Sequence, residues 1–281
     1  QIHLNNYRNF DDFKINLKGN CSVILGPNGS GKTNLLESIS LFEKGRGFRK
    51  ALLNNIINYT NMDNMFLVNS NFTTQKNDLD LILTCELNNN KLKKKILVNG
   101  SDSKESLRYF EKLYSVIWFL PEMERLFLGS PSLRRNFFDR LIYGIDKSYL
   151  ILLNNYKKKI LERNKILKQM NYDENWIFHV ENEIVNYGLK IHFERIKHIK
   201  ILNFEIQSLQ NINKNLHNFN LAINDSFLTN QEITKVDFKS KYLLKLKQSR
   251  NYDAVVGGCK IGPHRSDICG IHMGQNLSLV L

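Results

Sequence analysis

An eight-residue segment at positions 26–33 restricts the possible folds more than any other feature of the chain. It carries glycine at its first and sixth positions, followed by lysine and threonine, which is the phosphate-loop pattern. A short apolar run at 22–25 precedes it, and apolar residues at helical spacing follow over 34–44. Strand, glycine loop and helix in this order predict an α/β nucleotide-binding lobe. The segment consists of Gly26, Pro27, Asn28, Gly29, Ser30, Gly31, Lys32 and Thr33.

Each residue type in this loop has a chemical reason to be there. Glycines let the backbone bend so that successive N–H groups converge on phosphate oxygens, and the helix that follows adds its own unpaired N–H groups. Lys32 is placed to reach the outer phosphates, and the hydroxyl of Thr33 is placed to coordinate Mg²⁺. The loop therefore predicts a site for a nucleoside triphosphate with its magnesium ion.

The first 130 residues contain several further strand-like runs. We expect an edge hairpin or two sheet strands over residues 2–17, with a turn at Asn5-Asn6, and a buried central strand at 22–25. An Asn99-Gly100 dipeptide predicts a tight turn after one of the later strands. Those later strands are expected at 65–68, 79–83, 95–98 and 116–120.

From about residue 132 the pattern changes to long helical periodicity. Apolar residues at helical spacing predict helices over about 149–167 and 175–209. After residue 247 the pattern loosens into glycine-containing segments and a weak strand. We therefore expect a phosphate-loop lobe at 1–130, a helical lobe at 131–247, and a return to the first lobe at 248–281.

Charge and composition limit the kinds of binding partner that the chain is expected to have. Lys and Arg outnumber Asp and Glu by 40 to 27, a formal net charge of +13, which favours a polyanion such as nucleic acid. The alternative is a lysine-rich proteome, because the chain is rich in the Asn, Lys and Ile of A/T-rich codons. No apolar run predicts a membrane span or a signal peptide, so we expect a cytoplasmic protein. The four cysteines lack metal-site spacing.

A complete ATPase also needs an acidic residue after an apolar strand to hold the metal. Two apolar runs end in such a residue, at Glu86 and at Glu122. Neither is part of an acidic pair, and a strand followed by a surface glutamate explains both more simply. The catalytic residues are therefore not identified.

Segments spread over the whole chain form a second pattern beside the loop. They read NYRNF at 6–10, LLESI at 35–39, GRGFR at 45–49, FLPE at 119–122, GSP at 129–131, RRNFFD at 134–139, ERNK at 162–165 and IGPHRSD at 261–267. In this order they resemble the RecF recombination mediator family. Ser266 stands where that family carries the first Asp of its Gly-Pro-His-Arg-Asp-Asp stretch.

This resemblance implies an ABC-type ATPase head, with a phosphate-loop sheet lobe and an inserted helical lobe, related to the heads of structural-maintenance-of-chromosomes proteins. In the family, ATP is sandwiched between two protomers, so that ATP binding drives formation of a homodimer that clamps single-stranded or duplex DNA. The implied role is recombinational repair at single-strand gaps, with RecR and RecO as partners in recombinase loading, and with links to replication restart and SOS induction. Arg8 is expected near the nucleotide on the same grounds.

The chain departs from the family pattern at its C-terminal end. The family's Ser-x-Gly signature loop, acidic strand and switch histidine would follow the GPHR segment, and none is found before Leu281. We interpret Gly274-Gln275 as a turn because it lacks the serine of the signature. With Gln1 in place of an initiating Met, the chain is expected to be a piece of a longer ATPase that holds nucleotide without hydrolysing it.

The sequence leaves open the roles of the other basic residues and several alternative functions of the chain. Arginines can hold phosphate or a partner's carboxylate, or serve only packing. The lysine run at 91–95 is equally compatible with DNA contacts and with a charged hairpin turn, whereas the run at 157–159 is expected on the solvated face of its helix. His264 is expected to order a loop. The alternative functions are a small-molecule kinase, a GTPase, whose base-reading element is matched imperfectly by QKND at 75–78, or a nucleic-acid-binding module without turnover. The arginines are Arg46, Arg49, Arg134 and Arg135.

Overall fold

The computed structural model describes residues 1–58, 65–73, 78–88, 91–169, 171–214, 219–225 and 234–277. The chain divides into two compact units, Gln1–Trp118 and Phe119–Leu281, and each is described by itself. The lobes predicted at 1–130, 131–247 and 248–281 stay a prediction, because compactness alone does not define a functional lobe.

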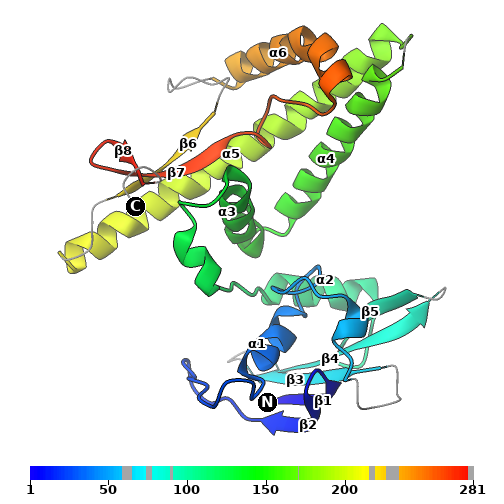
Figure 1. Ribbon diagram of the computed structural model, residues 1–281, viewed down its shortest axis with the longest axis vertical. Coiled ribbons are helices and arrows are strands. Elements are labelled where there is room, and N and C mark those ends of the chain that lie inside the picture. The colour runs from blue at the N-terminus through cyan, green and yellow to red at the C-terminus, as the bar shows by residue number, and fades with distance from the viewer. Residues whose placement is uncertain are drawn as a thin grey trace. The chain divides into compact units, whose positions relative to one another are not determined.

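The first unit is built on a five-stranded antiparallel sheet with the order β2-β1-β3-β4-β5 (Figure 1). Apolar side chains alternate along the inner strands, as a sheet with one buried face requires: Leu79, Leu81, Leu83 and Cys85 of β4 are all buried. The strands are β1 (Ile2–Tyr7), β2 (Phe10–Ile15), β3 (Leu67–Thr73), β4 (Asp78–Asn88) and β5 (Lys91–Val98).

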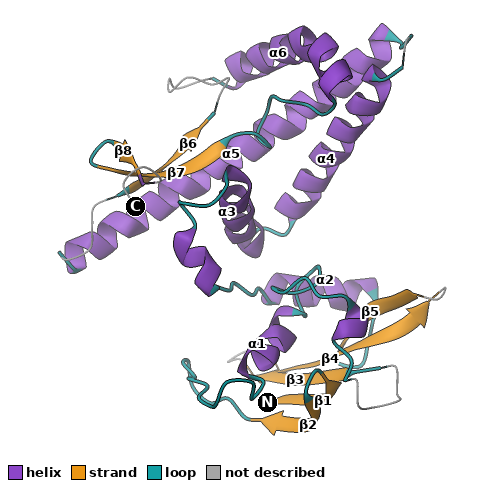
Figure 2. Ribbon diagram, in the orientation of Figure 1, coloured by secondary structure: helices purple, strands orange, loops and turns teal. Residues whose placement is uncertain are grey.

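Helices cover one face of this sheet (Figure 2). They are α1 (Lys32–Ser40) and α2 (Lys104–Leu113), with a short 3₁₀ helix, η1 (Leu53–Asn55), between them in sequence. Leu35 of α1 and Phe110 of α2 are buried in the same apolar core as the inner strands. The core thus lies between α1 and the sheet, so the helix that follows the glycine loop is anchored on its inner side.

The turn and the helix predicted for the first unit are confirmed, whereas the predicted position of the first hairpin turn is wrong. Asn99 and Gly100 form a tight turn with positive φ angles of 50° and 78°. Helix α1 follows the phosphate loop, although it ends at Ser40 rather than near residue 44. The first hairpin turns at Arg8 and Asn9, not at Asn5-Asn6, because β1 continues through Tyr7 in register with Phe10.

The strands expected at 22–25 and 116–120 are also wrong. In the described chain, both segments lack regular secondary structure and neither joins a sheet. Val23 is 78% exposed, Leu25 is 86% exposed and Phe119 is 64% exposed. Apolar composition predicts a buried strand only if neighbouring strands pair with it, and no described strand does so here.

The second unit is mainly helical (Figure 1). The two long helices predicted from the periodicity are confirmed, and the longer one is longer than expected. Asp173 caps it, accepting hydrogen bonds from the backbone N–H groups of Asn175 and Trp176. The helices are α3 (Pro131–Ile145), α4 (Ser148–Leu167), α5 (Glu174–Ile212) and α6 (Lys235–Val256), preceded by the 3₁₀ helix η2 (Pro121–Arg125).

Buried side chains at helical spacing hold these helices together. Ile177, Val180, Ile184 and Ile191 of α5 are each at most 1% exposed and contribute to one apolar core with α4 and α6. A small antiparallel sheet of order β6-β7-β8 completes the unit. Its last turn is Met273-Gly274, one residue earlier than the predicted Gly274-Gln275, because Gln275 begins β8. Its strands are β6 (Asn220–Asn224), β7 (Asp267–His272) and β8 (Gln275–Asn276).

None of the helices in the described ranges combines the length and the apolar character needed to cross a membrane. Residues 278–281 and residues 75–77 of the QKND string lie outside the described residues.

Candidate functional site

The phosphate loop forms an exposed bend directly before α1. Gly29 and Gly31 have φ angles of 83° and 94°, in the left-handed region that favours glycine. Gly31 is also required by space, since a Cβ there would overlap the ring of Phe10 and the side chain of Asn9. The β1–β2 turn therefore lies against the loop, and both positions select glycine for physical reasons.

The first turn of α1 has unpaired backbone donors. Its N-cap is Gly31, whose lack of a side chain leaves the helix without a side-chain cap. The first helical hydrogen bond runs from the N–H of Leu35 to the carbonyl of Gly31, at 2.9 Å. The N–H groups of residues 32–34 thus have no helical acceptor, and the positive end of the helix dipole adds to their field. This geometry suits a phosphate group.

Lys32 and Thr33 are the first two residues of α1. The ammonium group of Lys32 donates hydrogen bonds to the carbonyl oxygens of Gly26, at 2.7 Å, and Pro27, at 2.6 Å. The side chain thus lies back across the loop, where phosphate oxygens can replace the two carbonyls as acceptors. Thr33 is exposed, as are Pro27 and Asn28, while Lys32 is half-buried.

A buried carboxylate organises the surroundings of the loop. Glu37, on the second turn of α1, has a fully buried side chain and accepts two hydrogen bonds from Arg8, at 3.0 and 2.7 Å. Arg49 donates a third, at 3.2 Å. Arg8 also binds the carbonyl of Asn55, at 2.6 Å. One carboxylate therefore holds the β1–β2 turn and the segment after α1 beside the same helix.

Amide side chains extend this network toward the loop. Asn34, in the first turn of α1, donates to Asn9 and accepts from Arg49, both at 2.6 Å. Tyr7 is buried beside Glu37, and this burial, with the neighbouring carboxylate, raises the pKa of its hydroxyl. The sequence identified Arg8 and Arg49 but missed Glu37. The sequence feature that could have identified Glu37 is its position as a carboxylate three residues after Asn34, between the apolar Leu35 and Ile39 of the helix.

Lys94 stabilises the other end of α1. Its ammonium group donates to the carbonyl oxygens of Leu41, Glu43 and Gly45, at 2.8, 2.6 and 3.0 Å. Burial lowers the pKa of Lys94 to about 8, with Glu43 opposing the shift. A cation at a helix C-terminus also interacts favourably with the helix dipole. Lys94, which the sequence placed in a possible DNA-contacting run, thus has a structural role.

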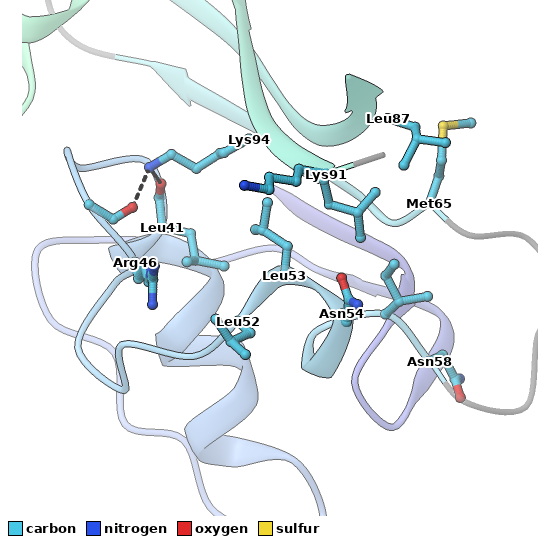
Figure 3. A pocket seen from close by; sticks show the side chains of 13 residues that line it. Leu41, Arg46, Leu52, Leu53, Asn54, Asn58, Met65, Leu87, Lys91 and Lys94 are labelled. Carbon is cyan, nitrogen blue, oxygen red and sulfur yellow. Dashed lines mark hydrogen bonds between the residues drawn. The ribbon is translucent and has the colours of Figure 1, made fainter. Parts of the chain in front are cut away.

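Lys94 and Arg46 line a groove of about 910 Å³ in the first unit (Figure 3). Leucine side chains from the segment after α1 and from β4 and β5 form much of its wall. None of residues 26–33 is among its described lining residues. The groove is therefore a separate feature from the phosphate loop.

Several of the other sequence candidates lie in structural elements or contacts away from the loop. Glu86 lies 3.5 Å from the ammonium group of Lys95, and Glu122 belongs to η2. Arg134 forms a bidentate pair with Asp267, at 2.8 and 2.7 Å. His264 contacts the carbonyl of Cys259 at 2.8 Å and so orders its loop, as expected. Within the described ranges, no cluster of three or more His, Cys, Asp or Glu side chains suits a metal ion.

Comparisons with known proteins support one family. Residues 1–112 match the RecF/RecN/SMC N terminal domain. The DNA replication and repair protein RecF of Rickettsia typhi is 31% identical over 278 residues, covering 98% of this chain and 74% of the relative. The corresponding protein of Rickettsia massiliae is 31% identical over 279 residues, with 98% and 74% covered.

Solved structures agree on the fold. A structure of the recombination mediator protein RecF-ATP in the RecFOR pathway matches with a TM-score of 0.81 and 24% identity, covering 100% of this chain and 74% of that one. A structure of RecF-ATPrS matches with a TM-score of 0.79 and 25% identity, covering 99% and 74%. The predicted ABC-ATPase-like α/β head with a helical lobe is confirmed. The chain belongs to the RecF family of DNA replication and repair proteins.

Proposed function

We propose that the chain binds ATP at residues 26–33 and acts as an ATP-dependent DNA-binding protein of recombinational repair. The observation that carries the proposal is the start of α1, where left-handed glycines precede unpaired N–H groups with no side-chain cap. Lys32 lies against the same loop and supplies the positive charge that phosphates require. The family of the chain and the RecF-ATP relative support ATP as the nucleotide.

Magnesium is proposed to bind with the nucleotide. Thr33 offers an exposed hydroxyl at the start of α1 and is the protein ligand we assign to it. Mg²⁺ commonly keeps several waters and takes one or two protein ligands beside the substrate phosphates, so a single threonine is compatible with its binding. Bound there, the ion would neutralise phosphate charge, while Lys32 and the free N–H groups of α1 position the phosphates.

DNA is proposed as the polyanionic partner. The net charge of +13 supports it, and so do the DNA replication and repair proteins that the chain resembles. We propose that ATP induces a homodimer that clamps single-stranded or duplex DNA, with RecR and RecO as partners in recombinase loading at gaps. Roles in replication restart and SOS induction, a cytoplasmic location and the lobes 1–130, 131–247 and 248–281 belong to the same proposal.

Nucleotide binding can be tested directly by titration calorimetry with Mg-ATP. Lys32→Ala should lower the affinity about 10- to 100-fold, because a charge-assisted hydrogen bond contributes roughly 1.5–3 kcal/mol. Lys18→Ala, an exposed lysine of the same unit, is the control and should leave the affinity unchanged. Binding that survives Lys32→Ala, or GTP binding that is tighter than ATP binding, would contradict the assignment.

DNA binding can be tested by filter binding to single-stranded, gapped and duplex DNA at two salt concentrations, with and without ATP. A clamp should bind more tightly with ATP, and its affinity should fall steeply with salt because binding releases counterions. A salt-dependent affinity that ignores ATP would instead indicate a nucleic-acid-binding module without a nucleotide switch. A chain that binds no DNA in either state would exclude the proposed function.

A further inference from the structure

The second unit contains a basic cavity that lies apart from the phosphate-loop site. It has a volume of about 160 Å³, far more than a single water molecule needs. Residues from α3, α4 and α5 and from the loop before β7 line it. Three of them are cations, Arg135, Lys157 and Arg195, and one is an acid, Asp139. We call this cavity the Arg135 pocket.

The charges of the Arg135 pocket do not balance. Arg195 is neutralised by Asp139, to which it donates two hydrogen bonds of 2.8 Å each. Arg135 and Lys157 have no carboxylate within 4.0 Å in the described part of the chain. Arg265, exposed on the adjoining loop, donates to a backbone carbonyl of Cys259 at 3.4 Å. The pocket and its rim therefore carry an excess of positive charge.

Arg135 is held in place while most of its donors stay available. One terminal nitrogen donates to the carbonyl of Ser266, at 2.6 Å, which fixes the guanidinium group on the loop before β7. A guanidinium group has five N–H donors in a planar fork, so four remain. Burial and the neighbouring Arg195 lower the pKa of Arg135, and Asp267 and Asp139 oppose this shift without cancelling it.

His264 shapes the pocket without supplying charge. Its two ring nitrogens are engaged, one with the hydroxyl of Tyr156 at 2.7 Å and the other with the carbonyl of Cys259 at 2.8 Å. Burial lowers its pKa to about 4, so it is neutral at physiological pH. An anion in the pocket would therefore be held by Arg135 and Lys157, with the histidine as a rigid wall.

We propose that the Arg135 pocket binds a phosphate group of the DNA backbone. This rests on the proposed function, to which it adds a location in the helical unit. An arginine fork matches the oxygens of a phosphate group, whereas Lys157 acts as a point charge beside it. Arg265, exposed on the loop that supplies Pro263 and His264 to the pocket, adds a further positive charge at its rim. A ligand with successive charges, as a nucleic-acid strand has, therefore fits better than a single ion.

The test uses two charge-removing variants of the 281-residue chain, Arg135→Gln and Lys157→Gln. Each should lower the affinity for DNA about eightfold at 0.1 M salt and reduce the salt slope by about one, as the loss of one phosphate contact predicts. The effect should be the same for different sequences, since backbone contacts carry no sequence information. Binding is measured by fluorescence anisotropy at several salt concentrations.

Controls separate this proposal from the proposed function and from misfolding. Lys165→Gln removes an exposed lysine of α4 outside the pocket and should leave the salt slope unchanged. Lys157→Gln breaks no hydrogen bond or ion pair found among the described residues, so its result stands even if Arg135→Gln disturbs the loop. If the wild-type protein binds no DNA, the proposed function is contradicted. If the wild type binds DNA and both variants keep its salt slope, only the assignment of the pocket is contradicted.

Titration with inorganic phosphate distinguishes the possible sources of the phosphate group. We expect phosphate to bind weakly to the wild type and to compete with DNA. In both variants, phosphate should no longer compete with DNA. If the variants lose phosphate binding while DNA binding and its salt slope persist, the pocket serves a free anion and the DNA assignment is overturned. The DNA assignment would also be overturned if an acidic peptide competes with phosphate for the pocket and DNA does not.

Discussion

The two units of the chain use buried charge in different ways. In the first, the buried carboxylate of Glu37 is held by Arg8 and Arg49, whose side chains are 19% and 38% exposed. In the second, the side chains of Arg163, Glu181 and Asp253 are all 0% exposed. Water reaches the first network and is excluded from the second. The first therefore lies at a surface that a ligand can approach, and the second is enclosed within the packing of helices.

The enclosed network joins three helices. Arg163 of α4 donates to Glu181 of α5, at 2.9 Å, and to Asp253 of α6, at 2.7 Å. Arg250 of α6 adds a 2.6 Å bond to Glu181 and a 2.7 Å bond to the more exposed Glu174. Such a network gains little over apolar packing, but removal of one member leaves a buried charge without its partner. It therefore specifies one arrangement of the three helices.

The largest expected effect comes from Arg163→Met. This change leaves Asp253 buried with Ser249 as its remaining partner among the described side chains, at 2.8 Å. We expect the free energy of unfolding of the second unit to fall by about 3–5 kcal/mol. Each unit has one tryptophan, Trp118 in the first and Trp176 in the second. Urea denaturation in a Trp118→Phe background therefore reports on the second unit.

Its matched control is Lys158→Met, which replaces an exposed cation on the same helix. That variant should stay within about 0.5 kcal/mol of the wild type, as most surface substitutions do. Equal effects of Arg163→Met and Lys158→Met would show that the buried network contributes no more than the surface does.

Mild acid should also affect the second unit more than the first. Burial lowers the pKa of His192 and His264 to about 4, while the unfolded chain protonates near 6.5. Between pH 6.5 and 4, these histidines are protonated in the unfolded state but not in the folded state. The stability present above pH 6.5 is therefore lost as the pH falls from 6.5 to 4. The loss approaches about 3 kcal/mol for each histidine. Residues 1–118 contain one histidine, His3, for which the structure gives no comparable burial.

Urea denaturation at pH 7 and pH 4.5, followed through each tryptophan in turn, checks this difference. The signal from Trp176 should shift and the signal from Trp118 should change much less. His179→Gln removes a histidine whose side chain is 74% exposed and should not alter the shift. A larger acid effect on Trp118 would reverse the comparison between the units.

Local signals explain what the sequence could predict. The glycines of the phosphate loop, the turn at Asn99 and the periodicity of α4 and α5 depend on residues close in sequence, and all three lie where expected. The strand prediction at 22–25 is wrong because strand pairing depends on residues distant in sequence. The Glu37 network was missed for the same reason, since Arg8 and Arg49 lie 29 and 12 residues away from it.

Glu37→Gln tests the accessible network and should cost less than Arg163→Met. Arg8 keeps the carbonyl of Asn55, Arg49 keeps Asn34, and both guanidinium groups can be partly solvated. We expect a loss of about 1–2 kcal/mol in the first unit, because the hydrogen bonds to the charged group are weakened rather than left without water. Trp118 fluorescence during urea denaturation measures it. A cost equal to that of Arg163→Met would mean that exposure makes no difference.

The smallest expected effects concern the starts of helices. Asp173 caps α5 and Ser103 caps α2, where its hydroxyl accepts from the N–H of Ser106 at 3.1 Å, whereas α1 begins at Gly31 without a side-chain cap. Asp173→Ala and Ser103→Ala should each cost about 1 kcal/mol, detected by Trp176 and Trp118 respectively. Mg-ATP should increase the free energy of unfolding of both variants only as much as it does for the wild type, because neither helix start is the nucleotide site. If both substitutions cost nothing, helix starts in this chain do not need caps, and the bare start of α1 ceases to be a sign of ligand binding. A cost at both α2 and α5 would show that a side-chain cap stabilises helices of this chain; α1 lacks one, as α3 and α4 do, but α1 alone of these three follows two left-handed glycines.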